Sequence, residues 1–388
     1  MPINFPQLLS LPQMKYYLIA GEASGDLHGS NLIREIKLRD TNAEIRCWGG
    51  DKMEAAGATL VKNYKDLAFM GFAEVLLNLR TILGNMKFCK QDIAAYRPDI
   101  IVMIDFPGFN LPIAKWAKPK GYKIAWYISP QVWAWKEKRV KEIKVCVDKM
   151  LCILPFEKDY YKKWDYKVEY VGHPLIEVIA GAKKIGSQLH LAVGNDSRGN
   201  TKKLIALLPG SRKQEILKKL PVMLEVSKRM PDYHFAVAQA PGQEDGFYEP
   251  LLKSFQNVSL VKNATYDLLM QCNAALVTSG TATLETALFG VPEVVCYKAH
   301  PISYQIAKRI IKIKYISLVN LIMDKPVVKE LIQEEMNADN VLIELNKILK
   351  DDRIHMQMKK DYDALWNLLA AGGNASAKAA EIIVGMVV

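Results

Sequence analysis

The residues of this chain that could do chemistry sit in short turns, each directly after an apolar run. The turns are Gly21-Glu-Ala-Ser-Gly-Asp26, Asp105-Phe-Pro-Gly-Phe-Asn110, Ser129-Pro-Gln-Val-Trp-Ala-Trp135, Leu208-Pro-Gly-Ser-Arg212 and Thr278-Ser-Gly-Thr-Ala-Thr-Leu-Glu285. An apolar run followed by a glycine or proline turn is typical of a buried strand that leads into a helix. The first backbone N–H groups of such a helix are unpaired, and with the helix dipole they attract phosphate. The pattern therefore predicts a site for a phosphorylated ligand.

The last two turns point to a diphosphate. After Thr278 the backbone would offer several N–H donors, and Glu285, one helical turn later, could accept hydrogen bonds from ribose hydroxyls. Arg212 offers a bidentate fork for a diphosphate, although its turn lacks the Gly-Lys-Ser/Thr ending of a nucleotide-hydrolysing P-loop. Two structural alternatives stay open: a helix that Ser279 or Thr281 merely caps, and an arginine that binds no ligand.

Asp105 is the candidate general base, because an acid that follows a central strand is well placed for catalysis. The neighbouring Phe106 and Phe109 offer low-dielectric surface. Such surface would raise the pKa of the Asp105 carboxyl towards the range that suits a base. The alternative is an aspartate that only forms the turn ahead of a proline.

The two remaining turns supply further candidates. The first turn is not Gly-x-Gly-x-x-Gly, so a dinucleotide-binding site is not supported, and its Ser24 or Asp26 is expected to cap the next helix. His28 lies in the first turn of that helix and is either a substrate donor or acceptor or a packed core histidine. Trp133 and Trp135 would bury poorly as pure core, which favours walls of an amphipathic ligand site.

Composition narrows the possible functions. The chain has 388 residues, enough for two domains, and a formal net charge of +11. The positive charge is dispersed and no nucleic-acid-binding motif is present, so phosphorylated ligands and an anionic membrane surface are favoured over nucleic acid. The six cysteines show neither CxxC pairs nor zinc spacing, which predicts reduced, buried thiols in a cytoplasmic protein without a metal site. Asp361-Tyr-Asp363, the only Asp-x-Asp motif, is expected to be solvated in a surface helix.

Short apolar runs alternate with helical stretches, which is the pattern of parallel sheets covered by helices. The expected strands are Tyr16–Ala20, Glu44–Cys47, Ile100–Ile104, Lys123–Tyr127, Met150–Ile153, Val168–Val171, Leu204–Leu208, His234–Ala238, Val258–Val261, Ala274–Val277 and Val294–Tyr297. The pattern predicts two doubly wound α/β domains, at 14–185 and 204–353, joined by a polar linker at 186–203. Residues 1–13 are expected to be a loose extension and a poor signal peptide, and the helices at 354–388 to pack on one of the two domains.

Two stretches favour contact with lipid. Residues 67–79 are apolar nearly all round, and residues 302–318 interleave isoleucines with basic residues such as Lys308 and Arg309, as in an interfacial helix. Each stretch is also compatible with an ordinary core or surface helix. Because no apolar run reaches the roughly 18–20 residues that cross a bilayer, peripheral contact is the form expected.

Eight motifs of the chain form a set that is specific in combination. They are GEASGD (21–26), DFPGFN (105–110), SPQVWAW (129–135), LPFE (154–157), GHP (172–174), LPGSR (208–212), SGTATLE (279–285) and SLVNL (317–321). In this order they make the chain resemble the lipid-A-disaccharide synthase family from about Met14 into the C-terminal region. The resemblance implies a GT-B glycosyltransferase fold, in which two Rossmann-like domains hold the active site in the cleft between them.

The resemblance also implies a reaction. The family transfers 2,3-diacylglucosamine from UDP-2,3-diacylglucosamine to the 6-hydroxyl of 2,3-diacylglucosamine 1-phosphate (lipid X). The products are the β-1,6-linked lipid A disaccharide 1-phosphate and UDP. Inversion by single displacement, without metal or cofactor, is the expected mechanism. The expected location is the cytoplasm of a Gram-negative bacterium with peripheral attachment to the inner membrane; nucleic acid is not an expected partner, and the oligomeric state stays open.

Position by position, the resemblance assigns roles to the turn residues. Asp105 matches the proposed general base, and Arg212 matches the arginine that steadies the leaving diphosphate. The residues expected to bind substrate are Glu22, Ser24, Gly25, His28, Ser129, Gln131, Trp133, Gly210, Ser211, Ser279, Gly280, Thr281, Glu285 and Asn320. Of these, the residues at 279–281 would contact phosphate and Glu285 the ribose. Some members carry a second acid where this chain has Gly108, so Asp105 is expected to lack a nearby carboxylate and a paired-acid mechanism is not supported.

Two other kinds of protein stay open. One is a different UDP-sugar enzyme of the same fold, such as a 2-epimerase or an enzyme with a polyprenyl-linked acceptor. Trials with acylated and free UDP-GlcNAc as donors would separate it from the family named above. The other is a non-catalytic lipid- or nucleotide-binding protein, which would bind UDP without turnover. The presence of Asp105 and Arg212 argues against that second possibility.

Overall fold

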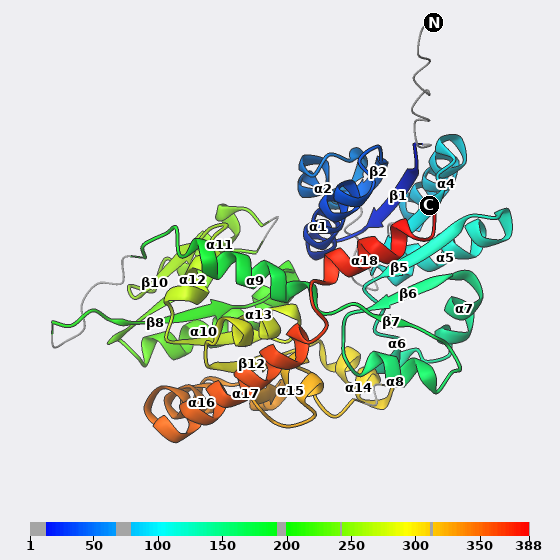
Figure 1. The fold of residues 1–388 in the computed structure, drawn as a ribbon. Coiled ribbons are helices and arrows are strands. Elements are labelled where there is room, and N and C mark those ends of the chain that lie inside the picture. Colours follow the sequence, from blue (N-terminus) through cyan, green and yellow to red (C-terminus); the bar gives the residue numbers. More distant parts are fainter. Residues whose placement is uncertain (1–12, 67–78, 192–198, 241–242, 311–312, 388) are drawn as a thin grey trace, which may run out of the picture. The chain divides into compact units, whose positions relative to one another are not determined.

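The chain forms two compact units, Met1–Pro174 with Gly373–Val388 (unit 1) and Leu175–Gly372 (unit 2). The computed structural model describes residues 13–66, 79–191, 199–240, 243–310 and 313–387 (Figure 1). Each unit is built on a parallel sheet, which confirms the expected α/β class with two parallel-sheet domains. The last helix of the chain returns to unit 1, whereas the helix before it stays in unit 2.

The sheet of unit 1 has the strand order β3-β2-β1-β4-β5-β6-β7 in the described residues, and all its pairs are parallel. The strands are β1 (Lys15–Ala20), β2 (Glu44–Gly49), β3 (Thr59–Asn63), β4 (Ile100–Ile104), β5 (Lys123–Tyr127), β6 (Lys149–Cys152) and β7 (Glu169–Tyr170). The predicted bounds of β4 and β5 are confirmed. The sequence analysis missed β3, an edge strand that is largely half-buried and carries little apolar signal.

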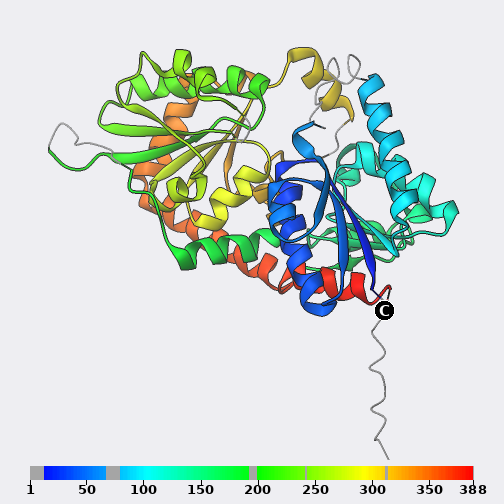
Figure 2. The same cartoon turned by 90° about the horizontal axis from the view of Figure 1, so that it is seen from above.

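Helices cover both faces of the unit 1 sheet, because alternate strand residues point to opposite sides. The helices are α1 (Ala23–Arg39), α2 (Asp51–Ala55), α4 (Leu79–Tyr96), α5 (Pro107–Ala117), α6 (Val132–Trp135), α7 (Arg139–Cys146), α8 (Glu157–Lys162) and α18 (Ala375–Val384). Tyr17 and Ile19 share a core with α4 and α5, whereas Leu18 shares the opposite core with α1 and α18. Figures 1 and 2 both show α18 alongside α1.

The sheet of unit 2 repeats this topology with the order β10-β9-β8-β11-β12-β13, again all parallel. The strands are β8 (Lys203–Leu208), β9 (Tyr233–Ala238), β10 (Val258–Val261), β11 (Ala274–Thr278), β12 (Glu293–Tyr297) and β13 (Lys329–Ile332). The sequence analysis missed β13, whose sequence KELI has two charges in four residues. The order of β8 to β13 is the doubly wound arrangement, in which strand order reverses beside the first strand.

Helices also flank the unit 2 sheet. They are α9 (Pro174–Ile185), α10 (Lys213–Lys228), α11 (Asp245–Leu252), α12 (Thr265–Gln271), α13 (Thr281–Phe289), α14 (Pro301–Ile310), α15 (Leu318–Met323), α16 (Ala338–Lys350) and α17 (Asp352–Ala370). Leu204, Ala206 and Leu208 share a core with α12, while α10 packs against α16. Helix α9, which the sequence analysis counts with the first domain, groups with unit 2 apart from its first residue.

Two sequence expectations about surface helices are wrong. The basic stretch at 302–318 is not one helix, because α14 ends at Ile310 and the next helix begins at Leu318. Of the Asp-x-Asp pair, Asp363 is exposed as expected, but Asp361 is not solvated: it is 7% exposed and its carboxylate accepts a hydrogen bond from Lys325 Nζ at 2.6 Å. The pairing was invisible in the sequence because the lysine comes from a different segment. The apolar stretch at 67–78 lies outside the described residues.

Candidate active site

In unit 1, the first two turns meet at the place where strand order reverses. Strand β1 pairs with β4, and Ala20 lies opposite Ile104 at the carboxyl ends of the two strands. The next residues are Gly21 and Glu22 on one side and Asp105 on the other. Ligands of doubly wound sheets bind at such a switch point. The topology therefore brings together two turns that are far apart in the sequence.

The turn at Asp105 has a strained backbone. Asp105 and Phe106 both have positive φ angles, 43° and 49°. Two hydrogen bonds hold the turn: Asp105 N–H donates to the Tyr127 carbonyl at 3.1 Å, and Asn110 Nδ2 donates to the Asp105 carbonyl at 2.8 Å. Non-glycine residues in the left-handed region cost about 1–3 kcal/mol each and gather at functional sites. The strained backbone of this turn is consistent with the prediction that it belongs to a functional site.

The Asp105 carboxyl has the pKa of a general base. The pKa of Asp105 is raised to about 7, mainly by burial and also by the negative charge of Glu22. A hydrogen bond from the Phe106 N–H opposes the rise. The predicted rise is confirmed. The expectation that Asp105 lacks a nearby carboxylate is wrong, because Glu22 arrives from the neighbouring strand rather than from the position of Gly108.

Close packing explains the glycine at the start of the first turn. A Cβ atom on Gly21 would lie 2.3 Å from the Phe106 ring, so a side chain there would push the ring away. Gly25 is buried, and a Cβ on it would lie 3.1 Å from Ala20 Cβ. Ser24 is exposed at the beginning of α1. The two glycines therefore let the turn, α1 and the Asp105 loop approach one another.

The expected helix cap is wrong. The N-cap residue of α1 is Glu22, and its side chain makes no cap hydrogen bond to the described helix. Asp26 instead accepts hydrogen bonds from the backbone N–H groups of Gly50 at 2.8 Å and Met53 at 3.0 Å. Asp26 thus caps the beginning of α2, a different helix. The sequence could not show this because the pairing depends on how β2 lies beside β1.

His28 is a buried histidine that holds its neutral form. Burial lowers its pKa to about 4, helped by the charge of Lys52, and its Nδ1 makes no hydrogen bond within the described residues. Burial also lowers the pKa of the neighbouring His173 imidazole to about 3, and the electrostatic cost of protonating two histidines beside each other lowers it further. The structure therefore favours the packed alternative for His28, and a contact with substrate stays a prediction.

The tryptophan turn is tied to the LPFE motif by a buried carboxyl. Glu157 accepts hydrogen bonds from the Leu154 N–H at 2.9 Å and from Trp133 Nε1 at 3.3 Å. Burial raises the pKa of Glu157 to about 7 in spite of these bonds. Ser129 is buried, and its hydroxyl lies 2.7 Å from that of Tyr161. These hydrogen bonds hold the tryptophan turn in place. The sequence did not predict this role of Glu157.

The outer part of the tryptophan turn is more open. Gln131 is exposed and stands at the beginning of α6. Trp133 is half-buried and meets Phe156 edge-on, with ring centroids 5.1 Å apart. The side chain of Trp135 lies outside the described part of the molecule. A ligand wall made by Trp133 therefore stays a prediction.

In unit 2, the other two turns also meet at a switch point. Leu208 at the end of β8 lies opposite Val277 of β11, so both turns leave the same edge of the sheet. Gly210 has a φ of 125°, and a Cβ on it would lie 2.6 Å from Glu215 Oε2. Arg212 is the exposed N-cap residue of α10, next to the exposed Ser211.

The SGT turn leaves the beginning of α13 without a side-chain cap. Gly280 is the N-cap residue, with a φ of 141°, and as a glycine it supplies no side-chain cap; the Thr283 hydroxyl in the first turn donates back to the Gly280 carbonyl at 2.8 Å. Ser279 Oγ instead donates to the Ile316 carbonyl at 2.7 Å, and Thr281 is exposed as the first helical residue. Neither Ser279 nor Thr281 is therefore the N-cap residue of α13, and a contact of the turn with phosphate stays a prediction. The helix N-terminus keeps its ability to attract an anion.

Glu285 is held in place by a tyrosine that the sequence analysis missed. Tyr266 on α12 donates its hydroxyl hydrogen to Glu285 Oε1 at 2.7 Å. Burial raises the pKa of Glu285, and the Tyr266 hydrogen bond lowers it. The bond fixes one carboxylate oxygen, and the contact of Glu285 with a ribose hydroxyl stays a prediction. The sequence alone could not indicate this role of Tyr266, because the contact with Glu285 depends on the packing of α12 on α13.

Asn320 has an internal role. It is 1% exposed, and its Nδ2 donates to the Val328 carbonyl at 2.9 Å and to Glu330 Oε1 at 2.9 Å. The Val328 N–H donates back to Asn320 Oδ1 at 2.9 Å. Asn320 therefore ties α15 to β13, and its proposed contact with substrate stays a prediction. The sequence analysis missed Glu330 because it missed β13.

Comparison with known proteins decides the family. The family described as lipid-A-disaccharide synthetase matches residues 16–384 of the chain. The chain belongs to the lipid-A-disaccharide synthase family. It is therefore an enzyme, a glycosyltransferase of lipid A biosynthesis, which excludes the non-catalytic alternative.

Individual members of the family are similar over almost the whole chain. The lipid-A-disaccharide synthase of Geobacter metallireducens is 37% identical over 97% of this chain and 98% of its own. That of Nitrosococcus oceani is 36% identical over 95% of both chains. The eight motifs thus identified the family from the sequence.

Solved structures with low identity share the fold. The glycotransferase of kitacinnamycin superposes with a TM-score of 0.65 at 15% identity, covering 97% of this chain and all of its own. UDP-GlcNAc 2-epimerase from Neisseria meningitidis, bound to UDP-GlcNAc, gives 0.64 at 14% identity, covering 96% and 99%. This member of the lipid-A-disaccharide synthase family therefore has the GT-B architecture that the resemblance implied.

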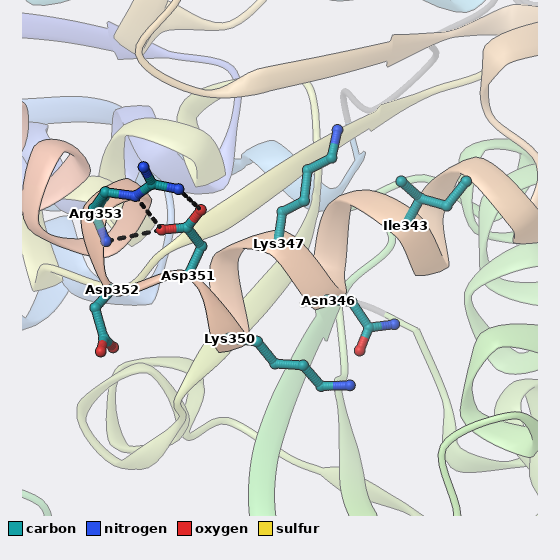
Figure 3. Close-up of a pocket in the computed structure, with 7 residues that line it drawn as sticks. All are labelled: Ile343, Asn346, Lys347, Lys350, Asp351, Asp352 and Arg353. Atoms are coloured by element: carbon teal, nitrogen blue, oxygen red, sulfur yellow. Dashed lines mark hydrogen bonds and ion pairs between the residues drawn. The ribbon is translucent and has the colours of Figure 1, made fainter.

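One surface cavity of this lipid-A-disaccharide synthase family member lies apart from the predicted site residues. A cavity of about 570 Å³ lies where α16 ends and α17 begins, and Figure 3 shows its side chains. The lining residues are Ile343, Asn346, Lys347, Lys350, Asp351, Asp352 and Arg353. Asp351 pairs with Arg353 at 3.4 Å inside the cavity wall. None of the predicted site residues lines it.

The described residues offer neither a metal site nor a membrane-spanning helix. They contain no group of three or more His, Cys, Asp or Glu side chains that could hold a metal ion. Among the described helices, none has the length and apolar character needed to cross a membrane. The cysteines in the described part are unpaired thiols, and all are buried except Cys272, which is half-buried.

Proposed function

We propose that the protein joins two acylated glucosamines, with UDP-2,3-diacylglucosamine as donor and 2,3-diacylglucosamine 1-phosphate as acceptor. The observation that carries the proposal is the Asp105 carboxyl, which stands at a strand-end switch point with a pKa of about 7. A base with such a pKa suits removal of a proton from a hydroxyl nucleophile near neutral pH. Family membership supports the choice of substrates.

The proposed reaction is a single displacement with inversion. Asp105 takes the proton of the acceptor 6-hydroxyl as that oxygen attacks the anomeric carbon of the donor. The bond from the anomeric carbon to the diphosphate oxygen breaks, and UDP leaves with the electron pair. The products are the β-1,6-linked disaccharide 1-phosphate and UDP.

Unit 2 is proposed to hold the nucleotide. The uncapped beginning of α13 at Gly280 and the Arg212 guanidinium would stabilise the negative charge that develops on the leaving diphosphate. Glu285, oriented by Tyr266, would accept hydrogen bonds from the ribose hydroxyls. These donors need no metal ion to bind a diphosphate, because helix N-termini and arginine supply the positive potential.

The direct test is a reaction with defined substrates. The purified protein is incubated with both acylated glucosamines in detergent micelles, and UDP and disaccharide are followed by mass spectrometry. We expect one UDP for each disaccharide. UDP without disaccharide would mean a different acceptor, and neither product from a folded sample would overturn the proposal. Free UDP-GlcNAc in place of the acylated donor tests donor choice.

The base assignment has its own test. Asp105→Asn should lower turnover by about 10²- to 10⁴-fold, because general base catalysis contributes that much. Its affinity for UDP should stay close to that of the original protein, since Asp105 belongs to unit 1 and the nucleotide turns to unit 2. Equal losses of turnover and UDP affinity would contradict the assignment.

We also propose peripheral attachment to an anionic membrane on the cytoplasmic side. The net charge of +11 and the exposed Lys308 and Arg309 on α14 support it. Flotation with vesicles of phosphatidylglycerol and phosphatidylethanolamine is the test. Binding should weaken as salt rises, and equal binding to neutral vesicles would contradict an electrostatic attachment.

A further inference from the structure

Lys219 is a buried cation of unit 2 that the proposed mechanism does not yet use. It lies on α10 among apolar residues, and only 2% of its surface is exposed. Its neighbours on the buried side of the helix include Ile216, Leu220 and Met223. A leucine or methionine would pack at this position without the cost of burying a charge. The presence of an ammonium therefore needs an electrostatic reason.

The contacts of Lys219 place its charge beneath the SGT turn. Its Nζ donates a hydrogen bond to Thr278 Oγ1 and lies 5.8 Å from the centre of the Tyr297 ring. Thr278 is the last residue of β11, and Ser279 and Gly280 follow it directly. The ammonium is thus one hydrogen bond away from the turn that opens towards α13.

The charge of Lys219 has no direct counter-charge among the described residues. No carboxylate of the described residues forms an ion pair with it. Burial lowers its pKa, the charge of Glu215 opposes this, and Arg212 and Lys218 lower the pKa further. Glu215 itself lies 3.6 Å from the Arg212 guanidinium, with which it forms an ion pair. Lys219 and Arg212 therefore sit on the same half of α10 and together leave an excess of positive charge beside the turn.

We propose that Lys219 is a positioning residue for the diphosphate of the sugar nucleotide. Its ammonium orients Thr278 and raises the positive potential at the SGT turn, and the bound diphosphate supplies the missing counter-charge. This inference rests on the proposed function, since it assumes a nucleoside diphosphate at that turn. It adds a second cation, buried behind the turn, to the exposed Arg212.

The test separates the diphosphate from the rest of the nucleotide. Calorimetric titrations with UDP, UMP and uridine are made on the original protein and on Lys219→Met, which keeps the length of the side chain but not its charge. We expect UDP affinity to fall about tenfold, because a charge-assisted interaction is lost. Uridine affinity should change by less than about twofold, as for a remote substitution. UMP should lie between the two.

Two further variants control for packing and for general charge. Lys219→Arg keeps the charge and should keep UDP affinity closer to the original than Lys219→Met does. Lys218→Met removes a charge from the neighbouring, half-buried position on the same helix and should leave UDP affinity nearly unchanged. Thermal unfolding of unliganded Lys219→Met should occur at the same or a higher temperature, because a buried charge without a partner destabilises the fold.

The outcomes distinguish this inference from the proposed function. Equal losses for UDP and uridine, or an undiminished affinity of Lys219→Met for UDP, would overturn the role of Lys219. If the original protein still binds UDP and forms disaccharide in that case, the proposed function stands. If the original protein binds no UDP at all, both proposals fall.

Discussion

Glu22 and Asp105 follow adjacent parallel strands, and the negative charge of Glu22 raises the pKa of the Asp105 carboxyl. Because the Glu22 charge lies at the same switch point, the Asp105 carboxyl stays partly protonated near neutral pH. Such an arrangement matches the pKa of a base to the conditions in which it works. It also makes the base sensitive to a residue that need not touch the substrate.

The first prediction concerns the pH dependence of catalysis. The kcat/KM of the original protein should rise with pH through about 7 and fall about tenfold for each pH unit below that value. Glu22→Gln removes a like charge, so the pKa of Asp105 should fall and the rising limb should move to lower pH. Initial rates between pH 5 and 9 measure the limb. A limb that stays in place would show that Glu22 does not act on Asp105.

The second prediction concerns the packing of Gly21 against Phe106. Gly21→Ala should lower the free energy of unfolding by about 1–3 kcal/mol, because the new methyl group overlaps the ring. It should also reduce kcat, since Phe106 shapes the strained turn of Asp105. Urea unfolding and initial rates measure both effects.

Gly108→Ala is the matched control for Gly21. A Cβ atom on Gly108 would meet no atom within 4 Å, and the residue lies in the first turn of α5. The fold of this variant should be as stable as that of the original protein or slightly more so. If both alanine variants behave alike, the close contact between Gly21 and Phe106 does not matter.

The third prediction concerns the tyrosine that holds Glu285. Tyr266→Phe should weaken UDP binding about fivefold, because loss of one hydrogen bond to a charged group costs roughly 1 kcal/mol or more. The variant should also discriminate less between UDP and 2′-deoxy-UDP, since Glu285 is no longer oriented towards the ribose. Calorimetric titration with both nucleotides gives the two affinities.

Tyr248→Phe serves as the control for Tyr266. The Tyr248 hydroxyl accepts a hydrogen bond from the Ala240 N–H at 3.0 Å, whereas the hydroxyl that bonds to Glu285 is that of Tyr266. This variant should bind both nucleotides like the original protein. An equal loss in both phenylalanine variants would point to a general effect on the fold of unit 2.

The fourth prediction concerns a buried carboxyl at the start of β12. Glu293 is fully buried, neither carboxylate oxygen has a hydrogen-bond partner within the described residues, and burial raises its pKa well above 4.5. The folded protein therefore holds a proton that the unfolded chain releases above pH 4.5. The contribution of Glu293 to the free energy of unfolding is therefore fully present below pH 4.5 and is lost as pH rises above that value.

Glu293→Gln should remove this loss of stability at high pH, because glutamine does not titrate. Its free energy of unfolding should match that of the original protein near pH 5 and exceed it by at least about 1 kcal/mol near pH 8. Urea unfolding at the two pH values is the measurement. Glu335→Gln, at an exposed position, should show no such difference between the two pH values. A Glu293→Gln protein that is less stable at both would mean that the carboxylate is paired.

The sequence predicted elements well where the signal is local. The run Ile100–Ile104 is buried on both sides of the sheet, so its apolar character marked β4 with the correct bounds. The edge strands β3 and β13 escaped, because they are short and mix charged with apolar residues. Parallel edge strands receive one neighbour only, and their sequences need less apolar surface.

Long-range pairings in the site could not be predicted. The sequence indicated Asp105 as a base, but the approach of Glu22 depends on the register between β1 and β4. Asp26 looked like a cap for its own helix and caps α2 instead. The sequence did not single out Lys219, because only the packing of α10 shows this lysine to be buried.

The return of α18 to unit 1 has a consequence for biosynthesis. Ala375, Ala379 and Ile383 of α18 complete the core that Leu18 and Ile33 share on one face of the first sheet. A nascent chain grows from its N-terminus, and domains fold as their residues emerge from the ribosome. Unit 2 can therefore finish folding first, while the face of unit 1 that receives α18 stays uncovered until Ala375–Val384 has been translated.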